Sequence, residues 1–203
     1  MPATKTPIEF YFDFSSPYGY LAATRINALA ANHQRRVNWR PILLGPMFKV
    51  AGTAPLLSVP LKGPYASRDI LRTARLQGIP YQHPDPFPIG TQNAARAFYW
   101  LNDRDPVKAQ LFATACYTTF FGQGIDISSA ETVADIAASL GEERMEVLTA
   151  MADPAVKERL KIEVDTALAK GVFGSPFFIV DGEPFWGNDR LDQVDAWLAT
   201  GGF

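Results

Sequence analysis

The stretch Phe10-Tyr11-Phe12-Asp13-Phe14-Ser15-Ser16-Pro17-Tyr18-Gly19-Tyr20 decides the fold of this 203-residue chain. Large apolar residues alternate from Ile8, just before this stretch, to Phe14, and this aromatic density favours a buried β-strand. Pro17 suits the first position of a helix, because its fixed φ fits there and its missing N–H is not needed. The pattern therefore predicts a strand that runs directly into a helix whose N-cap is Ser16.

The N-cap position of Ser16 can be interpreted in two ways. A serine at this point satisfies helix N–H groups that lack partners, which is the ordinary capping role. The same N–H groups, with the positive end of the helix dipole, can also hold an anion or favour a thiolate. The residues around Ser16 alone favour plain capping, so a functional role needs support from elsewhere in the chain.

Composition indicates an ordinary globular protein, formed by one domain or by one domain with a large insertion. Hydrophobic residues make up 47% and charged residues 20% of the 203 positions. The net charge of −2 gives no electrostatic case for binding nucleic acid or an anionic membrane. No apolar run has the length of a membrane span, and residues 1–7 lack the apolar region of a signal peptide. We therefore expect a cytoplasmic protein that binds neither nucleic acid nor membrane.

The single cysteine, Cys116, cannot form an internal disulfide. It lies in a segment with a wide apolar face, which predicts a packed core thiol rather than a nucleophile. The two histidines, His33 and His83, are far apart in the sequence, and no Cys/His/Asp cluster has the spacing of metal ligands. We predict no metal site.

Strand signals occur at both ends of the chain. A helix over residues 18–32 and a strand over 37–42 follow the first strand, which predicts a β-α-β unit with parallel strands. After Gly171 two strands are predicted at 176–180 and 183–186, joined by a two-residue turn at Asp181-Gly182. A helix over 190–198 closes the chain.

Helical signals predominate between these two blocks. The predicted helices cover residues 46–50, 68–77, 91–101, 106–121, 130–140, 142–151 and 154–170. A β-α-β start and a β-β-α end around a helical block predict an α/β protein, a thioredoxin-like fold with a large inserted all-helical domain. We place the thioredoxin-like domain at residues 1–44 and 166–203 and the inserted helical domain at 45–165.

Gly174-Ser175-Pro176 opens the returning strand. In a thioredoxin-like fold this position carries a cis proline that faces the N-terminus of the first helix, and such a bond is uncommon even before proline. It would leave the backbone N–H and C=O of Ser175 open to a peptide-like ligand. The alternative is an ordinary trans proline that begins an edge strand.

A third motif, Trp186-Gly187-Asn188-Asp189-Arg190-Leu191, precedes the last helix. Either Asn188 or Asp189 is expected to cap that helix, so backbone N–H groups and an acidic side chain stand together. This pair suits an amino acid head group, with the carboxylate on the N–H groups and the ammonium on Asp189. The alternative is a plain helix cap beside a solvated Asp-Arg pair.

With these motifs, essentially the whole chain resembles the 2-hydroxychromene-2-carboxylate isomerases and, more distantly, the kappa-class glutathione transferases. Both are glutathione-dependent relatives of the DsbA-type thioredoxin fold. The marks of the resemblance are Phe12-Asp13-Phe14-Ser15-Ser16-Pro17-Tyr18, Val172-Phe173-Gly174-Ser175-Pro176 and the Trp186–Leu191 motif. The last of these favours the isomerase branch.

The resemblance implies a role for each of five residues. Ser16 would activate the thiol of glutathione. Ser175, with the cis Pro176 behind it, would hold the cysteinyl backbone. Asn188 and Asp189 would bind the γ-glutamyl end.

Lys62, in Leu61-Lys62-Gly63-Pro64-Tyr65, resembles the lysine that meets the glycine carboxylate of glutathione in this family. Without the family resemblance, Lys62 can equally be interpreted as a solvated loop lysine.

Two positions depart from the family pattern. Gly52-Thr53 stands where Gly-Asn is frequent, which puts one glutathione contact in question, and Gly90 stands where an asparagine is expected near the substrate.

Disulfide exchange by the usual route is excluded, because Ser16 stands where it requires a cysteine and the neighbouring residues hold no sulfur. The sulfur must then arrive as a cofactor. The resemblance implies that this cofactor is glutathione, whose thiolate Ser16 and the helix dipole would stabilise. We hypothesise that this thiolate adds reversibly to a 2-hydroxychromene-2-carboxylate-type hemiketal acid. The ring opens, a bond rotates, and a trans-o-hydroxybenzylidenepyruvate-type product leaves while glutathione is regenerated.

Such a substrate is an aromatic carboxylate, so a cation should meet it. The candidates are Lys49 and the helix stripe Arg68, Arg72 and Arg75, although such a stripe is usually a solvated face.

Two other functions stay open: a glutathione transferase that releases an adduct, and a non-catalytic binder of glutathione or extended peptides. Aromatic residues over 117–121, expected to be exposed, indicate a homodimer.

Overall fold

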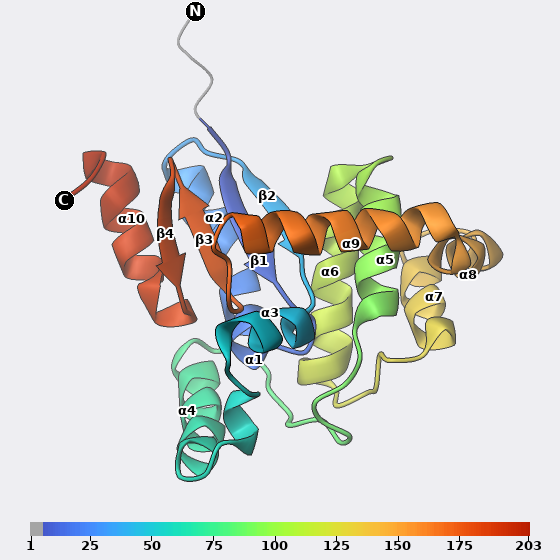
Figure 1. Ribbon diagram of the computed structural model, residues 1–203, viewed down its shortest axis with the longest axis horizontal. Helices are drawn as coiled ribbons and strands as arrows, with labels where there is room; N and C mark the ends of the chain where they lie inside the picture. The colour runs from blue at the N-terminus through green and yellow to red at the C-terminus, as the bar shows by residue number, and fades with distance from the viewer. Residues whose placement is uncertain (1–5) are drawn as a thin grey trace, which may run out of the picture.

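A four-stranded mixed sheet lies at the centre of the molecule in a computed structural model, which describes residues 6–203 (Figure 1). The strand order is β2-β1-β3-β4; β1 and β2 are parallel, and β3 is antiparallel to both β1 and β4. The bounds are Ile8–Phe12, Val37–Pro41, Phe177–Val180 and Glu183–Trp186. This is the β-α-β start and β-hairpin end that the sequence predicts. Residues 1–5 lie outside the described residues. The expectation that no signal peptide is present concerns residues 1–7 and therefore falls partly on them.

The aromatic residues of β1 form the centre of the core. Phe10 stacks on Phe178 of β3, with ring centroids 5.3 Å apart, and meets Trp39 of β2 edge-on at 5.0 Å. Phe12 contacts Phe98 and Tyr117 of the helical segment at 5.9 and 5.7 Å. The strand is therefore buried on both faces, as its nearly continuous apolar sequence predicts.

The crossover from β1 to β2 contains two helices, α1 (Pro17–Ala23) and α2 (Ile26–Asn32), where the sequence predicts one. The prediction was wrong at Thr24, which ends α1 and donates its hydroxyl to the Leu21 carbonyl at 2.8 Å. Such a local side-chain bond competes with the helical pattern.

The segment after β2 forms α3 (Leu44–Ala51), the short helix η1 (Leu56–Ser58) and α4 (Lys62–Leu76). Helix α4 begins earlier than the predicted residue 68, so Lys62 is its first residue and not part of a loop. Gly63 permits this start, because a Cβ there would clash with the Leu57 carbonyl of η1. In Figure 1 α4 lies at the lower edge of the molecule, away from α9.

The remaining helices cover the sheet and the side opposite α4. Helix α6 continues into a wide π-helical turn at Thr118–Gly122, and Figure 1 shows α9 crossing the molecule towards β3. The division into domains at residues 45 and 165 stays a prediction. The bounds are α5 Gln92–Asn102, α6 Pro106–Tyr117, α7 Ala130–Ser139, α8 Arg144–Ala152, α9 Pro154–Ala169 and α10 Leu191–Thr200.

The aromatic residues near the end of α6 are not exposed, which corrects the sequence-based expectation. Tyr117, Phe120 and Phe121 are completely buried, and Phe121 stacks on Tyr20 and Tyr81. They complete the core beneath α1, so they offer no surface to a second chain. The homodimer stays a prediction without this support. None of the helices within residues 6–203 is long and apolar enough to cross a membrane.

Candidate active site

Ser16 caps α1 as its sequence context predicts. Its backbone is extended, its Oγ accepts a hydrogen bond from the Gly19 N–H at 3.0 Å, and Pro17 occupies the first helical turn. The serine is 5% exposed. A nearly buried hydroxyl therefore lies at the positive end of a helix, a position that can stabilise negative charge.

The Ser175–Pro176 peptide bond is cis, which confirms the prediction, and it lies directly against Ser16. The Ser16 hydroxyl donates to the Ser175 carbonyl oxygen at 2.9 Å. The expectation that both backbone groups of Ser175 are unpaired was therefore wrong for the C=O, because the neighbouring hydroxyl satisfies it. The Ser175 N–H has no acceptor within residues 6–203.

Gly19 allows α1 to approach the core and the cis-proline segment closely. A Cβ at Gly19 would lie 2.6 Å from the Tyr117 hydroxyl oxygen and 2.8 Å from Ser175 Oγ. The Tyr117 hydroxyl in turn donates to the Asp13 carbonyl oxygen at 2.8 Å. Any side chain at position 19 would push the helix away from Ser175.

Asp13 holds the strand–helix junction to two other segments, a role that the sequence analysis missed. Its buried carboxylate accepts hydrogen bonds from the Leu44 N–H at the start of α3 (2.7 Å) and the Thr91 hydroxyl before α5 (2.7 Å). It also accepts from the Ser15 N–H at 2.8 Å. Burial raises the pKa of Asp13 by more than these three hydrogen bonds lower it. Its backbone N–H donates to Ser175 Oγ at 2.9 Å.

Asn188 and Asp189 lie in the short helix η3 (Asn188–Arg190), which packs against α1 and leads into α10. The prediction that one of them caps the last helix was wrong, since neither side chain makes a capping bond. Gly187 has φ +115°, a conformation that suits glycine and turns the chain into η3 instead. The Asn188 side chain is buried, and its Oδ1 has no hydrogen-bond partner within residues 6–203. Asp189 is exposed and contacts Arg190 Nη1 at 3.3 Å.

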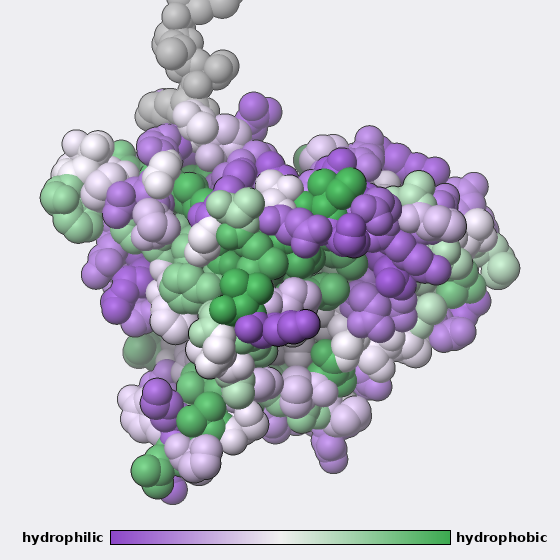
Figure 2. Space-filling view, in the orientation of Figure 1, coloured by the Kyte–Doolittle hydropathy of each residue, from purple (hydrophilic) through white to green (hydrophobic). Residues whose placement is uncertain are grey.

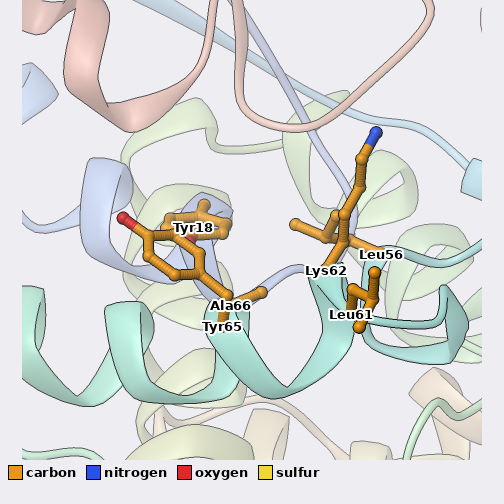
Figure 3. A pocket seen from close by; sticks show the side chains of 6 residues that line it. All are labelled: Tyr18, Leu56, Leu61, Lys62, Tyr65 and Ala66. Carbon is orange, nitrogen blue, oxygen red and sulfur yellow. The ribbon is translucent and has the colours of Figure 1, made fainter.

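A pocket of about 390 Å³ separates α1 from the start of α4 (Figure 3). Tyr18, Tyr65 and Ala66 lie on one side of it, and Lys62 lies on the other side, with Leu56 and Leu61. The Lys62 ammonium extends away from α4 in this view, and no carboxylate within residues 6–203 pairs with it. Most of the lining is apolar.

The Tyr18 hydroxyl donates to Asp69 of α4 at 2.7 Å, a second contact that the sequence analysis missed. Lys49, Arg68, Arg72 and Arg75 are all exposed, as the alternative of a solvated face predicts, and Arg72 pairs with Asp69.

The segment before α5 also reaches the site. The Ile89 N–H donates to Ser15 Oγ at 3.4 Å, and Thr91 contacts Asp13 as described above. Gly90, between them, is exposed, as is Thr53 after the C-cap of α3. Figure 2 shows hydrophobic side chains gathered in the middle of one face, over the region where α3 and the segment before β3 lie in Figure 1.

No thiol belongs to this site. Cys116 is fully buried in α6, and burial raises the pKa of its thiol. This confirms the prediction of a core cysteine. Within residues 6–203 no group of three or more His, Cys, Asp or Glu side chains could hold a metal ion.

Comparisons with known proteins identify relatives of this chain. The family model of the DSBA-like thioredoxin domain matches residues 7–199. A 2-hydroxychromene-2-carboxylate isomerase of Sphingobium xenophagum is 33% identical, over 96% of this chain and 98% of that protein. Glutathione S-transferase kappa 2 of Caenorhabditis elegans is 28% identical, over 98% and 94%. A solved structure of a 2-hydroxychromene-2-carboxylate isomerase superposes with a TM-score of 0.87 at 26% identity, covering 96% of this chain and 95% of the other.

Proposed function

We propose that this chain is a glutathione-dependent isomerase. It belongs to the family of DsbA-like thioredoxin domains and, within that family, to the 2-hydroxychromene-2-carboxylate isomerases and their kappa-class transferase relatives. Its substrates would be 2-hydroxychromene-2-carboxylate-type hemiketal acids and its products trans-o-hydroxybenzylidenepyruvate-type acids. The observation that carries the proposal is the nearly buried Ser16 hydroxyl, which caps α1 and lies against the cis Ser175–Pro176 bond.

The residues around Ser16 fit glutathione. The Ser175 N–H and the Asn188 Oδ1 both lack protein partners within residues 6–203, so neither loses an internal bond when it binds a polar ligand. Because Asn188 Oδ1 is buried, its side chain must turn towards the ligand to do so. The exposed carboxylate of Asp189 suits the ammonium of the γ-glutamyl group. Lys62, which has no acidic partner in the same residues, suits the carboxylate at the other end of the tripeptide.

Glutathione, when bound, would supply the nucleophilic thiolate that the chain itself lacks. Ser16 has a single hydroxyl proton, which is donated to the Ser175 carbonyl. To stabilise a sulfur anion, the Ser16 side chain must rotate and donate that proton to the anion instead. The N-terminus of α1 favours the same charge, and both effects lower the pKa of a thiol beside it.

The reaction can be tested with 2-hydroxychromene-2-carboxylate as the probe. We expect isomerisation that requires glutathione in catalytic amounts only, with the concentration of free thiol unchanged when all of the substrate has reacted. Turnover at the same rate without glutathione, or no turnover with it, would contradict the proposal.

A kappa-class-like transferase is the second candidate, favoured by the 28% identity to glutathione S-transferase kappa 2 over nearly the whole chain. It would use the same thiolate but release a glutathione adduct. With an electrophile such as 1-chloro-2,4-dinitrobenzene, stoichiometric loss of free thiol alongside no isomerisation would favour this second function.

A further inference from the structure

Helix α4 carries Lys62 but packs mainly against η1 and α1 and not against the sheet. Within residues 6–203, one side-chain hydrogen bond joins α4 to another helix or strand, from the Tyr18 hydroxyl of α1 to Asp69 Oδ2 at 2.7 Å. The remaining side-chain bonds of α4 are internal to the helix. Besides the packing of the buried Ala66, Ile70 and Ala74 side chains, this bond is therefore the polar contact that sets the position of α4, and with it Lys62, relative to α1.

The two partners of this bond are well placed to set the width of the pocket. Tyr18 follows Ser16 in the first turn of α1, whereas Asp69 lies two helical turns beyond Lys62. In Figure 3 the Tyr18 and Lys62 side chains lie on opposite sides of the pocket. The bond between Asp69 and Tyr18 therefore helps to set how far the Lys62 end of α4 lies from the Ser16 end of α1.

Arg72 supports the bond from the other side. Its guanidinium pairs with Asp69 Oδ1, donates to the Tyr65 hydroxyl at 3.2 Å and lies 5.6 Å from the Tyr65 ring centroid. Burial opposes ionisation of Asp69, but the hydrogen bonds from Tyr18 and Arg72 outweigh it and lower the pKa of Asp69. Asp69 thus acts as an ionised acceptor, and the same network holds Tyr65 at the pocket.

The chain entering α4 adds a reason for such a support. Leu61 has φ +66° and ψ −45°, and the Lys62 N–H donates to the Pro60 carbonyl at 2.8 Å, which forms a strained γ-turn. Leu61 is 90% exposed, so its own packing contributes little to holding this conformation. A strained backbone persists where the surrounding contacts impose it.

We propose that Asp69 is a positioning residue that holds Lys62 at the distance from Ser16 which a bound tripeptide spans. This inference rests on the proposed function, because it takes glutathione as the ligand and Lys62 as the partner of its glycine carboxylate. Asp69 itself touches no ligand in this proposal. Its loss should therefore weaken the contact at one end of the tripeptide only.

Calorimetry with two ligands tests this asymmetry. One ligand is glutathione, and the other is its glycinamide analogue, which has nearly the same size but no carboxylate at that end. We expect the wild-type chain to prefer glutathione by about fivefold, the contribution of one partly exposed ion pair. In Asp69→Ala this preference should fall to about one, with the affinity for the amide retained. Tyr18→Phe, which removes only the donor, should act in the same direction without a cavity.

Two further variants complete the test. In a Lys62→Met background, Asp69→Ala should change neither affinity, because the contact that it positions is already absent. Asp135→Ala is the matched control, since it removes another surface aspartate paired with an arginine, at 2.5 Å, and lies on α7. It should leave the preference at its wild-type value.

Two outcomes would overturn the inference alone: a wild-type preference that survives in both Asp69→Ala and Tyr18→Phe, or an equal loss of affinity for both ligands. The second outcome would indicate general destabilisation of the site. A wild-type chain that binds neither ligand would overturn the proposed function and this inference together, so the two failures are distinguishable.

Discussion

The Ser16 hydroxyl donates to the Ser175 carbonyl oxygen at 2.9 Å, across a separation of 159 positions in the sequence. The Ser16 hydroxyl oxygen also accepts a hydrogen bond from the Gly19 N–H at 3.0 Å. One side chain thus joins the start of α1 to the cis-proline segment before β3. The helix N-terminus and the backbone of Ser175 consequently face the same small volume, so one ligand can use both.

Replacing Ser16 separates capping from chemistry. Ser16→Ala should lower the free energy of unfolding by about 1 kcal/mol, as expected for a lost N-cap. It should also reduce turnover at saturating glutathione by at least about tenfold, because a thiolate loses its hydroxyl donor. Ser129→Ala is the matched control, since Ser129 caps α7 by accepting from Thr132 N at 3.0 Å. We expect the same loss of stability there but wild-type turnover, and equal turnover in the two variants would remove Ser16 from the mechanism.

The close approach at Gly19 predicts a steric effect on stability. In Gly19→Ala the new Cβ would lie 2.6 Å from the Tyr117 hydroxyl oxygen and 2.8 Å from Ser175 Oγ, so one of these groups must move. We expect a loss of about 1–3 kcal/mol in the free energy of unfolding, measured by urea denaturation. In Gly45→Ala, within α3, no atom lies within 4 Å of the new Cβ. That control should be neutral or stabilising, and a Gly19→Ala variant as stable as the control would contradict the packing described here.

Asp13 should make stability depend on pH. Its folded pKa is raised above the unfolded value of about 3.9, so between these two values the folded chain binds more protons than the unfolded chain. The contribution of Asp13 to the free energy of unfolding therefore falls as pH rises through this window and is constant above it. Asp13→Asn cannot titrate, and its amide NH₂ would face a backbone N–H, at a cost of about 1–3 kcal/mol.

The stability difference between wild type and Asp13→Asn should therefore be largest at acid pH and shrink as pH rises, which urea titrations at several pH values can measure. A difference that grows with pH would mean that the three hydrogen bonds to the carboxylate outweigh its burial.

Local chemistry explains which parts of the site could be predicted from the sequence. Ser16 and Pro17 specify a helix start through their own backbone preferences, and the Asp181-Gly182 turn specifies its hairpin in the same way. These features need no knowledge of distant residues. The cis bond before Pro176 needed one further step, the recognition of the fold around it.

Contacts between distant segments could not be predicted by the same reasoning. Tyr18 and Asp69 are 51 positions apart, and no periodicity in either helix indicates that the two meet. The interpretation of Asn188 and Asp189 as caps failed because Gly187 allows a backbone conformation that the residue types alone leave open. The end of α1 at Thr24 was missed, because the apolar spacing continues past this residue while the helix itself ends there.

Replacing Asn188 should weaken glutathione binding while leaving the stability of the protein nearly unchanged. Its Oδ1 is buried and has no partner within residues 6–203, so this atom is already desolvated without compensation in the protein itself. Asn188→Ala should therefore change the free energy of unfolding by less than about 1 kcal/mol, because the unsatisfied oxygen and part of the packing are lost together. The affinity for glutathione, measured by calorimetry, should fall by about tenfold, since the ligand loses a buried partner worth about 1.4 kcal/mol.

Asn93→Ala provides the contrast, because the Asn93 amide donates to the Ser128 carbonyl at 2.9 Å and its loss should reduce stability but not binding. If Asn188→Ala lowers the free energy of unfolding by well over about 1 kcal/mol while the folded variant retains its affinity for glutathione, then Asn188 supports the turn before α10 and does not bind the ligand.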